Sequence, residues 1–308
     1  MKKSKVAVCL ITYNHEQFVR EALEGIMMQE TNFDWMVHVA DDCSTDETRA
    51  IILEYQQKQP DKFHLIFKDR NVGPIQNWFN LIGSTNAEYI SYCEGDDYWT
   101  DPLKLQKQVD YLEKNMNVVA CFTNSRFIQA DGKLIREIYN PKANSNEFYD
   151  QEKCLTFLRS SYPTCTLMYR SIKLDEIPKS LMPKFCDELL DLVLTEKGII
   201  HCMKDTTANY RFHDKGEWNK NSQLKKLIEL FERTEAMYNT EFLRKKYKKQ
   251  LNQRYFDLIQ EIVLNEELSN SKRRHYFMKT ISHLDYFLPG TYKLILNFLL
   301  KSIQQIGQ

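Results

Sequence analysis

Residues 6–29, VAVCLITYNHEQFVREALEGIMMQ, decide the fold class. They begin with the β-branched apolar run 6–12, which has the length and composition of a buried strand. After a polar turn, apolar residues recur at helical spacing, at Val19, Ala22, Leu23, Ile26 and Met27. A buried strand that leads into an amphipathic helix is the repeating unit of a parallel α/β sheet.

The same alternation continues through the first half of the chain. The predicted strands are 35–42, 63–67, 88–93 and 118–124, and the predicted helices are 44–58, 74–82 and 101–115. Ser44 and Glu47 form a capping-box pattern at the start of the second helix. We therefore expect an α/β fold with a Rossmann-like, mostly parallel sheet covered by helices, in which ligands bind beyond the carboxyl ends of the strands. From residue 222 to 308 the pattern becomes helical and highly charged, with segments 271–285 and 290–305 among the expected helices.

Composition excludes several classes of protein. The 308 residues carry 42 basic and 42 acidic side chains, so no net charge favours a nucleic-acid partner. The eight cysteines are scattered without a C-x-x-C pair, which argues against a zinc site or a disulfide framework and favours a reducing compartment. No apolar window of about 18 residues is present, so we expect a cytoplasmic protein.

Two acidic clusters follow strands of the predicted sheet. ADDCSTD (40–46) follows the second strand and EGDD (94–97) follows the fourth, so both fall on one rim. Carboxylates this close repel one another unless a cation lies between them, although each cluster alone could equally be a solvated turn. The first strand–helix turn, 12–15, has no glycine, which disfavours a Rossmann dinucleotide site and a P-loop. A diphosphate bound here would need a cation to neutralise it.

Several ordered motifs resemble family 2 glycosyltransferases with the GT-A fold. They are VCLITYNHEQFVREALEGIMMQ, DDCSTDET, NVGPIQNW and YISYCEGDDYWTDPLKLQKQVDYL, and the resemblance covers roughly residues 5–220. It implies a nucleotide-sugar donor, UDP-linked in our interpretation, a Mn²⁺ or Mg²⁺ cofactor and inversion at the anomeric carbon. The motifs are similar to the bacterial branch that builds surface polysaccharides, which implies a glycan or lipid-linked acceptor. Residues 1–221 would form the transferase domain, with a nucleotide-binding half at 1–115 and an acceptor half at 116–221.

The resemblance also assigns residues. The expected nucleotide-binding residues are Thr12, Tyr13, Asn14, Glu16, Asp41, Asp42, Asp46, Glu94, Gly95 and Asp96. Glu94 stands where the family has the first aspartate of Asp-x-Asp, which leaves open whether it reaches ribose or metal. We expect Asp96 and Asp97 to bind the cation, with His213 as a further ligand. Arg211, His213 and Trp218 match a loop that folds over the diphosphate; a plain strand end is the alternative interpretation.

The transfer reaction needs a general base to deprotonate the acceptor hydroxyl. Asp187, in KFCDELLDLVLTEKG (184–198), matches the family segment best, and the adjacent Glu188 is the alternative. Aspartate is also a favoured helix N-cap, so a purely structural role is the alternative interpretation of Asp187.

Two other functions are alternatives to glycosyl transfer, and two basic runs could form a binding surface. A sugar nucleotidylyltransferase would need a glycine-rich loop after the first strand, and an inactive binding module would not need the acids. The basic runs LRKKYKKQ (243–250) and SKRRHYFMK (271–279) are either solvated helix faces or a contact with the anionic inner face of a membrane.

Overall fold

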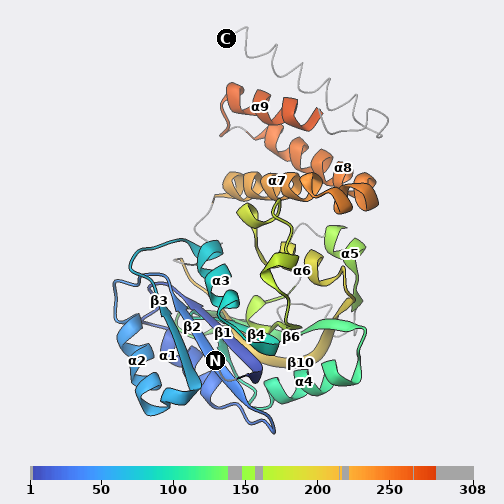
Figure 1. Ribbon diagram of the computed structural model, residues 1–308. Helices are drawn as coiled ribbons and strands as arrows, with labels where there is room; N and C mark the ends of the chain where they lie inside the picture. Colours follow the sequence, from blue (N-terminus) through green and yellow to red (C-terminus); the bar gives the residue numbers. More distant parts are fainter. Residues whose placement is uncertain are drawn as a thin grey trace. The chain divides into compact units, whose positions relative to one another are not determined.

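The computed structural model describes residues 3–137, 148–156, 162–214, 216, 222–265 and 267–281 (Figure 1). The chain divides into two compact units. The first comprises residues 1–177 and 185–213, and the second comprises residues 178–184 and 214–308.

The first unit is an α/β domain built on one mixed sheet. Its strands are β1 (Ser4–Thr12), β2 (Trp35–Asp41), β3 (Phe63–Phe67), β4 (Ala87–Glu94), β5 (Tyr98–Trp99), β6 (Val118–Gln129), β7 (Leu134–Arg136), β8 (Phe148–Tyr149), β9 (Met168–Arg170) and β10 (Ile199–Phe212). Its α-helices are α1 (Val19–Met27), α2 (Thr48–Lys58), α3 (Pro74–Gly83), α4 (Lys104–Lys114), α5 (Gln151–Thr156) and α6 (Asp187–Leu194). Short 3₁₀ turns lie at Pro60–Lys62, Thr164–Thr166 and Leu174–Glu176.

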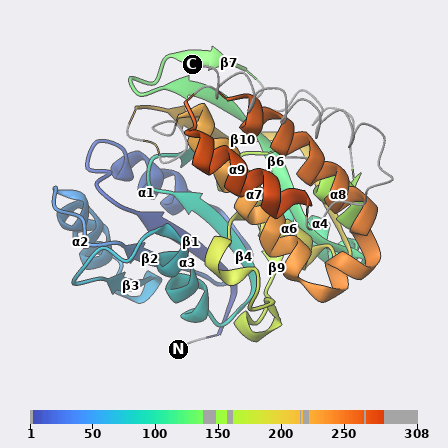
Figure 2. The same cartoon turned by 90° about the horizontal axis from the view of Figure 1, so that it is seen from above.

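The sheet order confirms the predicted fold class. Strands run β3-β2-β1-β4-β9-β6-β10-β5, with β7 beside β6 and β8 beside β10 (Figure 2). Neighbours from β3 to β4 are parallel, as are β6 and β10, whereas β9 is antiparallel to both β4 and β6. The result is a mostly parallel sheet flanked by helices, in which β9 joins two parallel halves.

Burial of one face of β1 against α1 organises the core. Val6, Val8 and Leu10 are fully buried in the same cluster as Leu23 and Ile26 of α1. Each such aliphatic side chain contributes about 1.5–3 kcal/mol when it leaves water. This packing fixes the carboxyl end of β1 and the turn that follows it, which is where the first predicted site residues lie.

A close approach explains the glycine inside α1. A Cβ atom on Gly25 would lie 2.6 Å from the backbone oxygen of Trp99, so only glycine allows α1 to rest directly on β5. Since β5 begins at Tyr98, directly after the acidic turn 94–97, this contact also anchors that turn to the helix.

One local prediction differs from the structure. The second helix begins at Thr48, and Ser44, the predicted cap, instead donates a hydrogen bond from its hydroxyl to the buried carboxylate of Asp41. Further along the chain, Gly132 has a φ of +84° in the turn between β6 and β7, and the 3₁₀ turn Thr164–Thr166 precedes the short β9.

The described part of the second unit is helical. It contains α7 (Gln223–Asn239), α8 (Glu241–Leu264) and α9 (Asn270–Ile281). The rings of Phe231 and Tyr255 meet edge to face at 5.3 Å between the buried faces of α7 and α8. The helix predicted at 290–305 lies outside the described residues.

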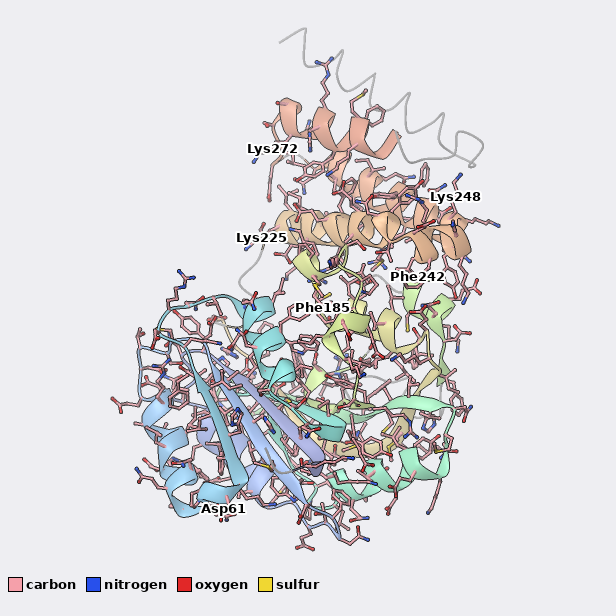
Figure 3. The ribbon with its side chains drawn as sticks, in the orientation of Figure 1. Asp61, Phe185, Lys225, Phe242, Lys248 and Lys272 are labelled. Carbon is pink, nitrogen blue, oxygen red and sulfur yellow. The ribbon has the colours of Figure 1, made fainter. Side chains whose placement is uncertain are left out.

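The basic run 244–249 lies on α8, where Tyr247 has a non-helical backbone conformation. Its cations are exposed, and Lys248 is one of those labelled in Figure 3. Within the described helices, none combines the length and the apolar character that crossing a lipid bilayer requires.

Candidate functional site

The strand register brings three predicted site residues to one edge of the sheet. Thr12 at the end of β1 pairs with Asp41 at the end of β2, and Ile11 pairs with Glu94 at the end of β4. The two acidic clusters therefore flank the end of β1, as expected of parallel strands whose carboxyl ends share one rim.

The two loops on this rim are hydrogen-bonded to each other. The backbone N–H of Asn14 donates to the Ser44 hydroxyl at 2.9 Å, and the side-chain oxygen of Asn14 accepts from the backbone N–H of Thr45 at 2.8 Å. Glu16 repeats the pattern, because its backbone N–H donates to the Asp46 carboxylate at 3.0 Å. Asn14, with a φ of +55°, thus fixes the loop, while the Tyr13 side chain beside it is 41% exposed.

Asp41 and Asp42 both carry internal partners. Asp41 is fully buried and forms an ion pair with Arg49, with 2.5 Å between Oδ2 and Nε. The Asp42 carboxylate accepts from the backbone N–H groups of Val72 and Gly73, each at 2.8 Å. Asp41 and Asp42 therefore hold the loops of the rim in place. A contact of either carboxylate with a nucleotide base or ribose stays a prediction.

The carboxylate of Asp96 lies between two imidazoles. His213 Nε2 is 2.9 Å from Asp96 Oδ2, and His15 Nε2 is 3.9 Å from the same oxygen. Burial opposes ionisation of Asp96, but the hydrogen bond from His213 and the charges of both imidazoles outweigh it, so the pKa of Asp96 lies below its ordinary value. An ionised carboxylate beside two nitrogen donors is a set that can bind a divalent cation.

His15 was not among the residues expected from the sequence. Its Nδ1 lies 3.2 Å from the Thr12 hydroxyl, and burial lowers the pKa of its imidazole despite the charge of Asp96. The one signal for it in the sequence is its position in the turn 12–16, between Asn14 and Glu16, which are both expected nucleotide-binding residues.

Gly95 is required by this close arrangement. A Cβ atom there would lie 2.6 Å from the Thr12 hydroxyl and 2.8 Å from His15 Nδ1. Since real Cβ atoms do not approach that closely, the glycine permits the acidic turn to rest against the end of β1.

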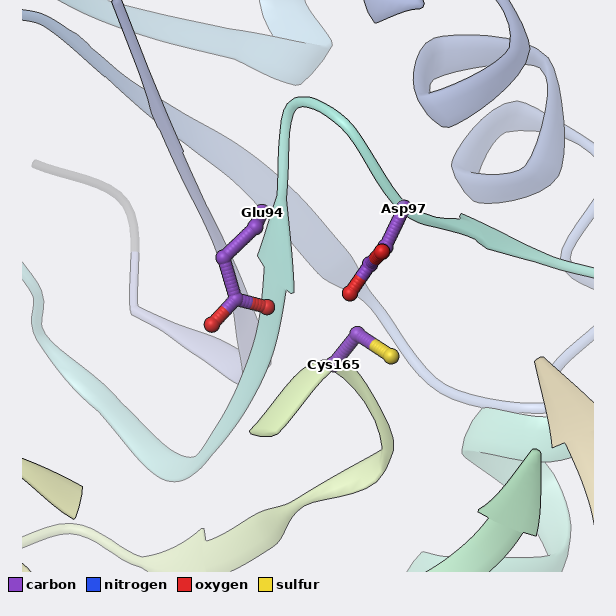
Figure 4. Close-up of side chains that lie close together, drawn as sticks. All are labelled: Glu94, Asp97 and Cys165. Atoms are coloured by element: carbon purple, nitrogen blue, oxygen red, sulfur yellow. The ribbon is translucent and has the colours of Figure 1, made fainter. Parts of the chain in front are cut away.

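The side chains of Glu94 and Asp97 lie close to that of Cys165 (Figure 4). One ligand atom from each of the three lies within 4.8 Å of the others. Burial, then the neighbouring aspartate charges, raise the pKa of Glu94 well above its ordinary value, and burial likewise raises the pKa of the Cys165 thiol. One oxygen of Glu94, Oε2, is buried without a hydrogen-bond partner in the described structure. Because a neutral thiol is a poor ligand for hard cations, the set of Glu94, Asp97 and Cys165 is poorly matched to Mn²⁺ or Mg²⁺.

The end of β10 closes the site from one side. It carries Arg211 and His213, both buried, to the acidic turn. The backbone N–H of Arg211 donates to the Asp97 carboxylate at 2.8 Å, and burial and the Asp96 charge raise the pKa of Asp97. Trp218, expected in the same loop, lies outside the described residues.

Asp187 opens α6 on the same edge of the domain. It is half-buried, and its Oδ2 lies 3.5 Å from the Thr164 hydroxyl, beside Cys165. Its charge also contributes to the raised pKa of Glu94, after burial and the charges of Asp97 and Asp96. Glu188 is 3% exposed, so Asp187 is the more accessible of the two candidate bases.

Comparisons with known proteins show the family of the chain. A family model described as "Glycosyl transferase family 2" matches residues 7–176. A protein of Mycobacterium tuberculosis is 37% identical over 215 residues, which are 70% of this chain and 60% of the relative, so the chain spans less than two thirds of that relative's length. TuaG of Bacillus subtilis, a glycosyltransferase named for teichuronic acid biosynthesis, is 25% identical over 142 residues, 46% of this chain and 55% of TuaG.

A solved structure has the same fold. Staphylococcus aureus TarS 1–349 in complex with UDP-GlcNAc superposes with a TM-score of 0.66 at 18% identity. The superposition covers 91% of this chain and 82% of TarS, and at this identity it supports the fold alone.

Proposed function

Because the chain belongs to glycosyl transferase family 2, we propose that it transfers a sugar from a nucleoside-diphosphate sugar to an acceptor hydroxyl, with inversion at the anomeric carbon. The observation that carries the proposal is the ionised Asp96 held against His213 at the rim where β1, β2 and β4 end. A rim of this kind is where α/β sheets bind their ligands. A sugar nucleotidylyltransferase no longer fits, since the family model matches residues 7–176.

The nucleotide would occupy the turn after β1. Tyr13 offers an exposed ring for a base to stack on, and Thr12, Asn14, Glu16 and Asp46 shape the loop around it. Asp41 or Asp42 would accept from the base or ribose, with Glu94 and Gly95 on the other side of β1. We take UDP as the nucleotide, since the structurally similar TarS was crystallised with UDP-GlcNAc.

A divalent cation, Mn²⁺ or Mg²⁺, would be held by Asp96 and His213, with Asp97 next along the turn. When bound, it would supply positive charge to a departing nucleoside diphosphate. A diphosphate alone would meet the carboxylates of Asp96 and Glu94 without compensation, because the turn after β1 lacks the glycine-rich backbone that cradles phosphates elsewhere.

Asp187 would act as the general base. It lies at the start of α6 and is more accessible than the adjacent Glu188. The proton of the attacking hydroxyl would pass to its carboxylate as the hydroxyl oxygen bonds to the anomeric carbon and the diphosphate departs. The Thr164 hydroxyl, 3.5 Å from Oδ2, would orient that carboxylate toward the acceptor.

The acceptor in our proposal is a growing surface polysaccharide, free or lipid-linked. The relative TuaG, whose name refers to teichuronic acid biosynthesis, supports this choice. We place the protein in the cytoplasm, at the inner face of the membrane. The exposed cations Lys245, Lys246, Lys248 and Lys249 of α8 would provide a contact with anionic lipids, worth about 1 kcal/mol each near the surface.

Thermal unfolding with a panel of nucleotides tests the donor site. UDP, GDP, dTDP and CMP would each be added with and without Mn²⁺, and a ligand that binds only the folded state must raise the melting temperature. We expect a rise with UDP that requires Mn²⁺ and is absent in the variant Asp96→Asn. No rise with any nucleotide would favour an inactive binding module instead.

The membrane contact has its own test. Flotation with vesicles containing anionic lipid should carry the protein at low salt and release it at high salt. A variant with the four α8 lysines changed to glutamine should stay in the soluble fraction; equal flotation of both proteins would rule this contact out.

A further inference from the structure

The guanidinium of Arg211 is engaged on all sides by its own domain. Nε donates to the backbone oxygen of Asp96 at 2.9 Å, and Nη1 donates to the backbone oxygen of Ala130 at 2.9 Å. Nη2 forms an ion pair with Glu21 of α1 at 2.5 Å. The Arg211 side chain is only 3% exposed, whereas that of Glu21 is 47% exposed. Arg211 is therefore directed into the domain and bonded to three different segments.

Two aromatic rings hold the guanidinium in place. Its central carbon lies 4.8 Å from the ring centre of Phe18 and 5.3 Å from that of Tyr98. An arginine between aromatic faces gains cation–π attraction, which adds to the hydrogen bonds in the guanidinium plane. To reach a ligand outside the domain, Arg211 would have to give up these contacts together.

The same strand end contacts the acidic turn at three points. Arg211 holds the Asp96 carbonyl through Nε and the Asp97 carboxylate through its backbone N–H. Two residues later, His213 contacts the Asp96 carboxylate itself. Arg211 and His213 together thus contact the Asp96 carbonyl and the carboxylates of Asp96 and Asp97.

From these contacts we propose that Arg211 is a positioning residue for the cation site rather than a ligand of the donor diphosphate. It fixes the acidic turn so that the Asp96 carboxylate and His213 Nε2 stay side by side, 2.9 Å apart, where they would hold the cation. Glu21 contributes to the same positioning, because its carboxylate on α1 binds the Arg211 guanidinium. This inference rests on the proposed metal-dependent transfer function and replaces the diphosphate contact that sequence resemblance suggested for Arg211.

The two roles predict opposite results for Glu21. If Arg211 positions the turn, Glu21→Ala loosens the guanidinium and weakens the cation site. If Arg211 contacts the diphosphate, the same change removes a competing acceptor, and UDP should bind as well or better. Glu21 is half-exposed on a helix and alanine is a good helix former, so this variant should fold. Glu24→Ala is the matched control, since it removes an exposed glutamate from the same helix.

The experiment measures Mn²⁺ and UDP binding separately. Electron paramagnetic resonance reports free Mn²⁺ during titrations at fixed UDP, and calorimetry gives the UDP affinity at saturating Mn²⁺. For Arg211→Lys we expect a loss of Mn²⁺ affinity of about 10–100-fold, the range typical when the partner of a metal ligand is changed. Glu21→Ala should shift Mn²⁺ affinity in the same direction by a smaller factor, and Glu24→Ala should match the wild type. At saturating Mn²⁺, both Arg211→Lys and Glu21→Ala should recover the wild-type UDP affinity and kcat.

Different failures have different signatures. If the wild type binds UDP with Mn²⁺, but Glu21→Ala keeps wild-type Mn²⁺ affinity and Arg211→Lys loses UDP affinity that Mn²⁺ does not restore, the positioning role is wrong and the diphosphate contact is correct. If the wild type binds neither Mn²⁺ nor UDP, the proposed function fails and the positioning role fails with it. Should Arg211→Lys not fold, Glu21→Ala alone decides between the two roles.

Discussion

His213 Nε2 lies 2.9 Å from the carboxylate of Asp96, although 117 residues separate the two along the chain. The contact exists because the end of β10 pairs with β5, the strand that directly follows the turn after β4, with Asn209 opposite Tyr98. It places an imidazole nitrogen and a carboxylate oxygen side by side at the rim of the sheet.

Asp96→Asn should abolish the metal dependence of nucleotide binding. Asparagine keeps the shape of the side chain but lacks the negative charge that a divalent cation requires. We expect kcat/KM to fall by at least about 100-fold, since even the partners of metal ligands cost 10–100-fold when changed. The control is Asp131→Asn, an exposed aspartate at the turn between β6 and β7, which should leave turnover unchanged. Metal-dependent UDP binding that survives Asp96→Asn would contradict this assignment.

Asp187→Asn should reduce kcat by about 100-fold to 10,000-fold, the usual contribution of a general base, and should leave UDP affinity intact. Glu188→Gln is the comparison, because this adjacent glutamate is only 3% exposed. We expect the glutamine variant to lose far less activity. Steady-state kinetics give kcat for each variant, and separate titrations give the UDP affinity. A larger loss of kcat in Glu188→Gln than in Asp187→Asn would assign the role of base to Glu188.

Gly95→Ala should damage both folding and ligand binding. The added methyl would meet the Thr12 hydroxyl and His15 at 2.6 and 2.8 Å, so the acidic turn must shift away from β1. Overpacking of this kind costs about 1–3 kcal/mol of stability. Gly83→Ala, at the end of α3, would meet only the flexible Leu174 side chain at 3.1 Å and is the control. Chemical denaturation gives the free energy of unfolding of both variants. Equal values would show that the acidic turn can accommodate a methyl group at position 95.

The buried amine of Lys104 should make stability depend on pH in an unusual direction. Its Nζ is hydrogen-bonded to two neutral groups, the Ser91 hydroxyl at 3.1 Å and the Gln108 side-chain oxygen at 2.7 Å. Burial lowers the pKa of Lys104 from 10.5 to about 8. Between those values the unfolded chain binds more protons than the folded one, so the free energy of unfolding should rise with pH, by up to about 1.4 kcal/mol per pH unit. Below pH 8 both states are protonated and this contribution is constant.

Lys104→Met isolates that contribution. The difference in unfolding free energy between wild type and variant should shift in favour of the wild type as the pH rises from 8 toward 10. Denaturation curves recorded at several pH values give the difference directly. Two stability curves that stay parallel over this range would show that Lys104 titrates normally.

Much of the fold could be predicted, because the spacing of apolar residues indicates each strand and helix and their order along the chain indicates a parallel α/β sheet. The run 6–12 and the helical spacing that follows it are local patterns, and parallel strands necessarily place their following turns on one rim. The start of α2 was wrong by a turn of helix, since a capping pattern cannot reveal that the Ser44 hydroxyl is needed by the buried Asp41. Likewise, no local pattern distinguishes the 3₁₀ turn at Thr164–Thr166 from a strand.

Residue types at fixed spacing along the chain are enough to predict the α/β fold class, the family resemblance and the acidic turn. What those residues touch depends on the tertiary structure. It brought His213 to Asp96, added His15 to the site and directed Arg211 into the domain. These contacts join segments that are distant in sequence, and the packing of β10, α1 and the acidic turn against one another fixes them, which spacing does not encode.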